Sequence, residues 1–137
     1  MTLYKKVYVS LDIKNDVNYK HMLSAWNHSN GLEFVSRYND GGDVSSQKTL
    51  IMSLLRSANI VLTIIGSKSD SLHAKSKDIG YRNWQNFEIA KAREYKKKIV
   101  AVFIDSAFAT PVELLGAGYI KVNKFDHDSI LRAIKLC

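Results

Sequence analysis

The stretch NIVLTIIGS, residues 59–67, is almost continuously apolar, and the prediction of the fold begins with it. A strand with one solvated face alternates apolar and polar residues. An unbroken β-branched run is instead typical of a strand covered on both faces in a parallel sheet. A second run of this kind, IVAVFID, occupies residues 99–105. The two runs predict the centre of a parallel sheet with helices on both sides.

Weaker strand patterns and amphipathic helical patterns alternate with these two runs. The strand patterns are short and rich in β-branched or aromatic residues. They are KVYVSLD (6–12), LEFVSR (32–37) and YIKV (119–122). The helical patterns carry apolar residues at near-helical spacing. They cover 16–30, 45–58, 84–98 and 126–137, and a short helix is expected to begin at Pro111.

Polar residues that can cap a helix precede several of these patterns. The candidate N-caps are Asp16, Ser45 or Ser46, and Asp126 or Asp128. Strands and helices that alternate in this way form a parallel sheet with right-handed crossovers. We therefore expect one α/β domain over residues 1–137, a flavodoxin-like doubly wound sheet of five strands in the order 2-1-3-4-5.

The composition limits the classes of protein to which the chain can belong. Of its 137 residues, 46% are hydrophobic and 24% are charged, as in a folded globular protein. The apolar runs are far shorter than the roughly 20 residues of a membrane span. The only cysteine is Cys137, which excludes an internal disulfide framework and favours the cytoplasm. A net charge of +7 favours phosphate-bearing partners.

The expected site lies beyond the carboxyl ends of the strands. In an open parallel sheet, ligands bind at the switch point, here between the first and third strands. The segments that leave these strands and the start of the helix at 84–98 should line the pocket. The candidate residues are Ser10, Leu11 and Asp12, then Gly66, Ser67, Lys68 and Ser69, then Trp84 and Glu88. Tyr38, Asp40 and Asp43 join them, because the loop after the second strand leaves the sheet beside the first.

The chain lacks the residues that several common functions of this fold require. A phosphoacceptor domain needs an aspartate at the end of the third strand, where this chain has TIIGS. The phosphate-binding patterns G-x-x-x-x-G-K-[ST] and G-x-G-x-x-G are both absent. The histidines have no spacing that suits a metal; they are His21, His28, His73 and His127. We expect neither a metal nor a bound cofactor.

The order of motifs resembles a known superfamily over most of the chain, from Val7 to about Tyr119. A first strand that ends in VYVSLDIKND is followed by the apolar strand IVLTIIGS and a polar loop. The pattern W-x-x-x-E-I on a helix and the strand KKIVAVFID come next. This order is similar to Toll/interleukin receptor (TIR) domains. It is most similar to the TIR-like proteins of the bacterial Thoeris antiphage defence system, the ThsB type.

The resemblance implies an enzyme that cleaves the bond between nicotinamide and ribose in NAD⁺. The catalytic glutamate of the W-C-x-x-E motif then corresponds to Glu88 and its aromatic residue to Trp84, while Ser10 lines the nucleotide pocket. The product implied is an ADP-ribose derivative, which is cyclic in some members and signals to a separate effector protein. Gln85 stands where the motif usually has cysteine, and the loop at 67–83 is longer and more basic than usual.

Physical chemistry agrees with a carboxylate in this role. Loss of nicotinamide leaves positive charge on the ribose, in an oxocarbenium-like transition state that a fixed anion stabilises. Nicotinamide departs as a neutral molecule, so the reaction needs no general acid.

Two other functions remain open at this point. One is a non-enzymatic TIR-like adaptor that associates with copies of itself through helix and loop surfaces. The other is a nucleic-acid-binding protein that contacts phosphates through KAREYKKK (91–98) and SLHAKSKD (71–78). The run at 91–98 ends a helix at the edge of the sheet opposite the expected pocket, which favours a solvated helix face.

Overall fold

The computed structural model describes residues 5–27, 31–37 and 42–137. Strands and helices alternate along the chain as the hydrophobic pattern predicts. The elements are β1 (Lys5–Ser10), α1 (Ile13–Ser24), β2 (Leu32–Val35), α2 (Val44–Ser57), β3 (Ile60–Ile65), α3 (Ser76–Ile79), α4 (Trp84–Glu94), β4 (Lys98–Phe103), the 3₁₀ turn η2 (Val112–Leu114), β5 (Ile120–Val122) and α5 (His127–Lys135). None of the helices in these ranges is long and apolar enough to span a membrane.

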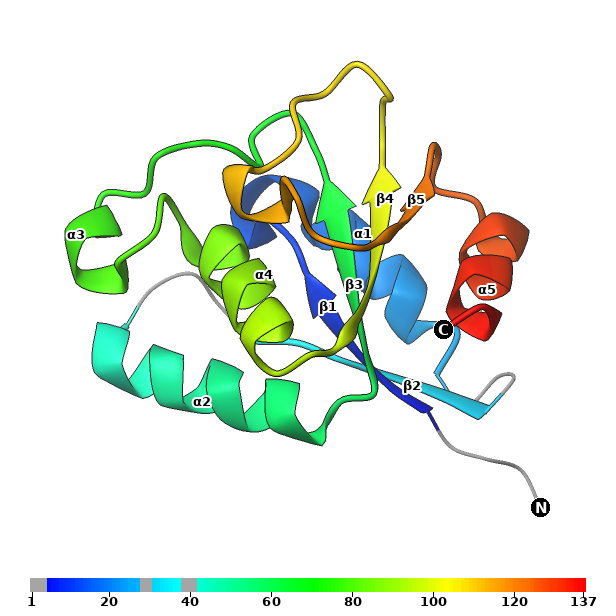
Figure 1. The fold of residues 1–137 in the computed structure, drawn as a ribbon, viewed down its shortest axis with the longest axis horizontal. Coiled ribbons are helices and arrows are strands. Elements are labelled where there is room, and N and C mark those ends of the chain that lie inside the picture. Colours follow the sequence, from blue (N-terminus) through cyan, green and yellow to red (C-terminus); the bar gives the residue numbers. More distant parts are fainter. Residues whose placement is uncertain (1–4, 28–30, 38–41) are drawn as a thin grey trace.

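The five strands form one parallel sheet in the order β2-β1-β3-β4-β5, which confirms the predicted topology. Each consecutive strand lies parallel to its neighbour, so all carboxyl ends meet at one edge of the sheet. In Figure 1 the arrowheads of β3 and β4 point to this edge, at the top of the view. The chain reverses direction across the sheet between β1 and β3, which places a switch point there.

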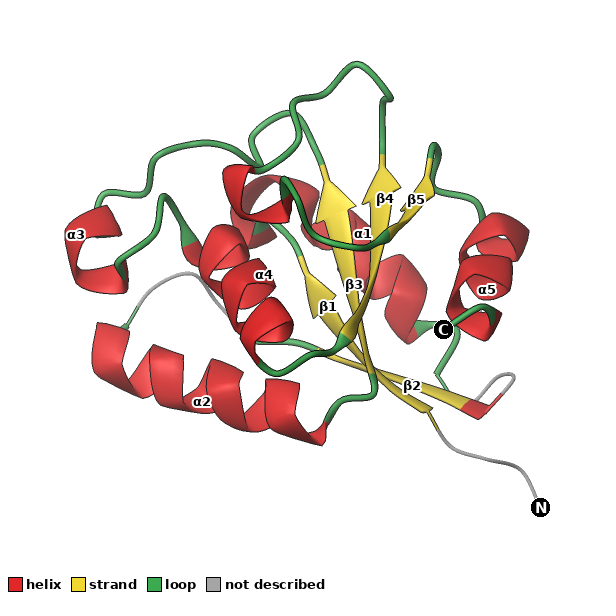
Figure 2. Ribbon diagram, viewed as in Figure 1, coloured by secondary structure: helices red, strands yellow, loops and turns green. Residues whose placement is uncertain are grey.

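Helices cover both faces of the sheet, as Figure 2 shows. Successive side chains of a strand point to opposite faces, and β3 contributes apolar residues to both. Leu62 and Ile64 pack with α1 and α5 on one face, whereas Val61 and Ile65 pack with α2 and α4 on the other. All six residues of β3 are buried, which explains why its sequence shows no polar alternation.

Some helix boundaries differ from the prediction. The N-cap of α1 is Asp12 and not Asp16, because the Asp12 carboxylate accepts from the backbone N–H groups of Lys14 and Asn15. The N-cap of α2 is Asp43, which precedes both predicted serines and accepts from the N–H of Ser46. The expected Asp126 caps α5. A carboxylate is as good a cap as a hydroxyl, so composition alone does not choose between neighbouring candidates.

The short helix α3 lies inside the polar stretch at 67–83, for which the sequence predicts only a loop. Two side chains tie this stretch together. The amide of Asn83 donates to the carbonyls of Ser69 and Ser71, and the Arg82 guanidinium donates to the carbonyl of Asp70. The stretch leads directly to the first residue of α4 at the carboxyl edge of the sheet.

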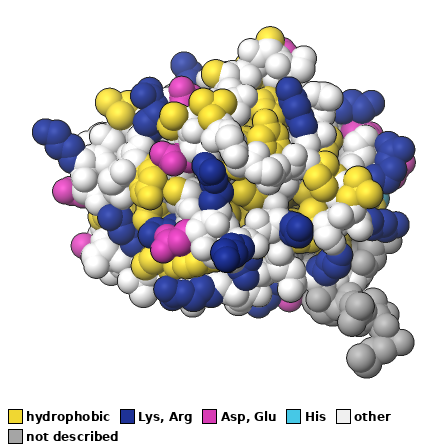
Figure 3. Space-filling view, in the orientation of Figure 1, with side chains coloured by type: hydrophobic (Ala, Val, Ile, Leu, Met, Phe, Trp, Pro, Cys, Tyr) yellow, Lys and Arg dark blue, Asp and Glu magenta, His cyan; other side chains and the backbone are white. Residues whose placement is uncertain are grey.

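Basic side chains are scattered over the face of the molecule in Figure 3, with acidic side chains between them. The C-terminal end of α4 contributes Lys97, whose ammonium donates to the backbone carbonyls of Arg56 and Ala58. This lysine therefore caps carbonyl groups at the amino edge of the sheet, opposite the switch point.

Candidate active site

Glu88 is fully buried and faces the sheet. Its carboxylate accepts three hydrogen bonds from other side chains. Ser10 Oγ donates to Oε1 over 2.8 Å, while Arg37 Nε donates to Oε2 over 3.1 Å and the Tyr8 hydroxyl also donates to Oε2. Three donors around one carboxylate match its ionised form, because an ionised carboxylate only accepts.

The strand and helix periods explain how these residues meet. Tyr8 and Ser10 are two residues apart on β1, so both side chains point to the face that α4 covers. Glu88 stands one helical turn after Trp84 on the buried side of α4. Arg37 follows β2, the neighbour of β1, and reaches across the end of β1. Its Nη2 atom donates to the Leu11 carbonyl over 3.0 Å.

Burial sets the electrostatics of this cluster. It raises the pKa of Glu88, and the Arg37 guanidinium and the hydrogen bonds from Tyr8 and Ser10 oppose that rise. Burial and the adjacent carboxylate hold the pKa of the Tyr8 hydroxyl well above its ordinary value. Tyr8 therefore stays protonated and keeps donating its hydrogen bond.

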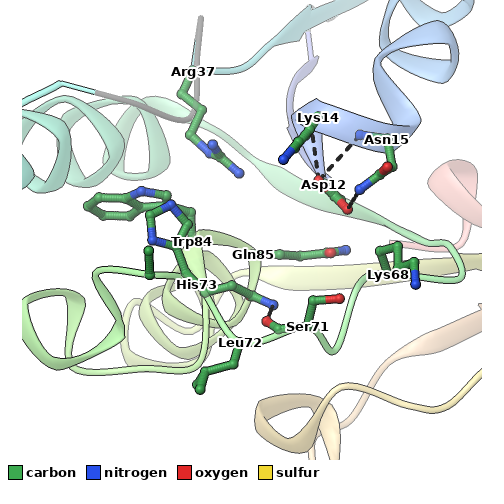
Figure 4. A pocket seen from close by; sticks show the side chains of 12 residues that line it. Asp12, Lys14, Asn15, Arg37, Lys68, Ser71, Leu72, His73, Trp84 and Gln85 are labelled. Carbon is green, nitrogen blue, oxygen red and sulfur yellow. Dashed lines mark hydrogen bonds between the residues drawn. The ribbon is translucent and has the colours of Figure 1, made fainter.

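A pocket of about 460 Å³ opens at the carboxyl edge, next to this cluster. Figure 4 shows Arg37 on the side of the pocket opposite Ser71 and Leu72, which belong to the stretch at 67–83. The lining residues come from the start of α1, the end of β2, this stretch and the start of α4. They are Asp12, Lys14, Asn15, Arg37, Lys68, Ser71, Leu72, His73, Ala74, Asn83, Trp84 and Gln85. Glu88 is not among them and lies behind Arg37.

Gln85, the second residue of α4, joins the pocket wall to the sheet. Its amide nitrogen donates to the hydroxyl of Thr63 over 2.9 Å and to the carbonyl of Ile64 over 2.7 Å. Its amide oxygen is buried and has no hydrogen-bond partner among the described residues. Since Ser10 and Thr63 are register partners on β1 and β3, two adjacent strand ends hold the first turns of α4 through polar contacts.

The predicted site residues fall into three groups. Asp12, Lys68 and Trp84 line the pocket, and Ser10 donates a hydrogen bond to the buried Glu88. Two candidates are buried in the fold: Leu11 in the core, and Gly66 against Asp16. Of the remaining candidates, the exposed Ser67, the buried Ser69 and the α2 cap Asp43 are not among the lining residues. Tyr38 and Asp40 lie outside the described residues.

Three of the residues that the sequence prediction did not name as part of the site are Tyr8, Arg37 and Lys14. Tyr8 was detectable, because it precedes Ser10 by two positions and so shares its face of the strand. Arg37 was detectable in part, since it leaves the strand beside β1 at the same edge. Lys14 lines the pocket but carries no local signal that separates it from a surface lysine.

A second buried carboxylate, Asp16, packs against Gly66 at the end of β3. A Cβ atom added to Gly66 would clash with the Asp16 carboxylate, so a larger residue there requires Asp16 to move. Burial, with a smaller contribution from the Asp12 carboxylate, raises the pKa of Asp16 to about 6. Within 5–27, 31–37 and 42–137, no three His, Cys, Asp or Glu side chains gather closely enough to hold a metal ion.

Comparison with known proteins supports the fold. No protein-family profile matches the sequence, and no curated protein matches it. Among solved structures, a CMP N-glycosidase of Clostridium botulinum, BcmB, aligns with a TM-score of 0.62 over 97% of this chain and 100% of that chain. The fold is flavodoxin-like. The two sequences are only 12% identical, so this likeness concerns the fold alone.

A 3-dehydroquinate dehydratase-like protein from Bifidobacterium longum also aligns, over 98% of this chain and 94% of that chain. Its TM-score is 0.49 and its identity is 13%.

Proposed function

We propose that this chain is a nucleotide N-glycosidase that cleaves NAD⁺ between nicotinamide and ribose, with Glu88 as the catalytic carboxylate. One observation carries the proposal. A fully buried carboxylate, held by three donors, lies at the switch point of the sheet directly behind the wall of a pocket of about 460 Å³. Burying a carboxylate lowers the stability of the fold, and buried titratable groups of this kind cluster at functional sites. Both facts favour a function for Glu88.

The proposed reaction breaks the bond between ribose C1′ and the pyridinium nitrogen. Both bonding electrons leave with nicotinamide, which becomes neutral, and positive charge develops on the ribose ring. Water then adds to C1′ and loses a proton to the solvent, so that NAD⁺ and water give nicotinamide, ADP-ribose and H⁺. Glu88 stabilises the cationic ring, and exclusion of water from its surroundings strengthens that attraction.

Other parts of the site suit a nucleotide substrate. Lys14 and Lys68 are exposed at the pocket and supply positive charge for phosphates. The Trp84 ring forms part of the wall and packs edge-on against Phe87, which fixes its position. The structural neighbour BcmB is a CMP N-glycosidase, so it too acts on a glycosidic bond in a nucleotide.

The sequence resemblance extends the proposal to a biological setting. In that setting the chain is a TIR-like protein of an antiphage system of the Thoeris type, and its ADP-ribose-derived product activates a separate effector. The order of motifs described above supports this assignment, including the tryptophan at 84 and the glutamate at 88.

Incubation of the purified chain with NAD⁺, with chromatography of nicotinamide, tests the proposal. Glu88→Gln keeps the size of the side chain and removes its charge. We expect it to lower nicotinamide release by about 100- to 1,000-fold, the effect of losing one transition-state contact. Glu94→Gln is the matched control, because Glu94 is exposed at the other end of α4 and pairs with Lys91.

The same assay with CMP separates NAD⁺ cleavage from a wider nucleotide N-glycosidase activity. Phage-challenged cell extract is added in one arm, because some TIR enzymes act only when triggered. If neither nucleotide loses its base in any arm, the N-glycosidase proposal is wrong and the adaptor function is favoured. Size-exclusion chromatography with light scattering then measures self-association.

A further inference from the structure

Arg37 separates the pocket from the Glu88 carboxylate. The arginine is 2% exposed, lines the pocket and donates to Glu88 Oε2, whereas Glu88 is fully buried and is not among the lining residues. A ligand that enters the pocket therefore meets the guanidinium before the carboxylate. As long as Arg37 and Glu88 are paired, the Glu88 carboxylate accepts from Tyr8, Ser10 and Arg37, and a ligand in the pocket does not reach it.

We propose that Arg37 selects substrates that carry a phosphate, because an anion in the pocket draws its guanidinium away from Glu88 and frees the carboxylate. This inference rests on the proposed N-glycosidase function and names the class of its substrate. A nucleoside without a phosphate has no group that competes for the arginine. The closed pair then excludes it from Glu88.

The chemistry of the guanidinium makes phosphate its natural competitor. Arginine binds phosphate oxygens through paired N–H donors, and a phosphate group offers more acceptor oxygens than a carboxylate. Glu88 receives only the Nε donor within 3.1 Å, while Nη2 is directed to the Leu11 carbonyl. The contact with Glu88 is therefore not bidentate, whereas a phosphate can accept two parallel N–H donors from one guanidinium.

The charges at the pocket support an anionic ligand. Lys14 and Lys68 are exposed on its rim, and neither forms an ion pair within the described part of the chain. The one acidic residue of the described lining, Asp12, accepts from the backbone of Lys14 and Asn15 and from the Asn15 side chain. Its charge thus stabilises the start of α1, and the lysines remain available to a phosphate.

The first test compares NAD⁺ with nicotinamide riboside, which has the same scissile bond and no phosphate. We expect the riboside to react about 10- to 100-fold more slowly, the effect of one charge-assisted hydrogen bond. Inorganic pyrophosphate, added in trans, should recover about 10-fold of that loss and should not accelerate cleavage of NAD⁺. Sodium chloride at equal ionic strength is the control for screening.

Arg37→Ala removes the side chain between the pocket and Glu88, and it should abolish the preference for NAD⁺ over nicotinamide riboside. We expect it to cleave the riboside as fast as it cleaves NAD⁺, and pyrophosphate should then have no effect. Arg82→Gln is the matched control, because Arg82 is an exposed arginine of the stretch at 67–83 that pairs with Asp70, and this variant should keep the wild-type preference. Equal rates on both substrates in the wild-type protein would contradict the inference and leave the N-glycosidase function standing.

A binding measurement on the wild-type chain covers the case in which Arg37→Ala does not fold or no substrate is cleaved. The Nε–H signal of Arg37 is followed by NMR during titration with pyrophosphate and with ADP-ribose, and Arg37→Lys assigns it by its absence. Both ligands should shift it, and adenosine should not. A shift without cleavage of any nucleotide means that the proposed reaction is wrong and the anion site is right; an unmoved signal overturns the site.

Discussion

The ion pair between Arg37 and Glu88 permits a quantitative prediction about stability. Both side chains are buried, at 2% and 0% exposure, and their nearest atoms are 3.1 Å apart. Removal of one partner leaves an uncompensated buried charge, so Arg37→Met and Glu88→Met should each lower the free energy of unfolding by about 3 to 5 kcal/mol.

The double variant Arg37→Met/Glu88→Met should be much less costly than the sum of the two. It removes both charges but leaves the Tyr8 and Ser10 hydroxyls and the Leu11 carbonyl without their partners. These losses and the gain from apolar packing largely cancel, and we expect a net change within about 2 kcal/mol of the wild type. The coupling free energy between the two positions should therefore exceed about 3 kcal/mol.

Urea denaturation at pH 7.5, followed by far-UV circular dichroism, measures all four proteins of this cycle. The singles should stay folded at low urea, because domains of this size have about 5 to 15 kcal/mol of stability. The buried pair would be refuted if the losses in free energy of unfolding of the two single variants added up to that of the double variant, or if each single loss were below about 1 kcal/mol. Such a result would place the guanidinium in water and remove the basis for the phosphate selection proposed above.

Two further predictions concern the contact between Gly66 and Asp16. Gly66→Ala should lower the free energy of unfolding by about 1 to 3 kcal/mol through overpacking, as measured by urea denaturation. In an Asp16→Ala background the loss should fall below about 1 kcal/mol. An equal loss in both backgrounds would contradict the contact. Because the pKa of Asp16 is raised to about 6, the folded chain binds its proton more tightly than the unfolded chain does. Stability from this group is therefore present below about pH 4 and is lost as the pH rises to about 6. Asp16→Asn lacks this loss, so its stability relative to the wild type should rise by about 1 to 2 kcal/mol between pH 4 and pH 7, after solvent screening is allowed for. A difference that does not change with pH would show that Asp16 titrates normally.

The sheet was predictable because its central strands are apolar on both faces. The runs at 59–67 and 99–105 fix two parallel strands, and the alternation of elements then fixes the order. The first helix begins one turn earlier than predicted because two aspartates, Asp12 and Asp16, both satisfy the local pattern. The choice between them depends on burial, since Asp16 is enclosed by Gly66 while Asp12 is free to cap.

The candidate site was predictable only where one strand or one helix determines it. The positions of Ser10 and Glu88 follow from β1 and α4. The role of Arg37 does not, because it depends on a distance between the end of β2 and the middle of α4, 51 residues later. The close packing of Gly66 against Asp16 likewise has no local signal, since the sequence around Gly66 is typical of an ordinary turn.

The carboxylate and the rim of the pocket belong to different parts of the architecture. Glu88 is fixed by a strand and a helix of the central layers, whereas a large share of the rim comes from the segment at 67–83, which is cross-linked mainly by its own polar contacts. Exchange of this segment should therefore alter the rim of the pocket and leave the position of the Glu88 carboxylate unchanged. If the proposed N-glycosidase function holds, residues 67–83 are the segment to exchange in order to change the nucleotide that the pocket accepts.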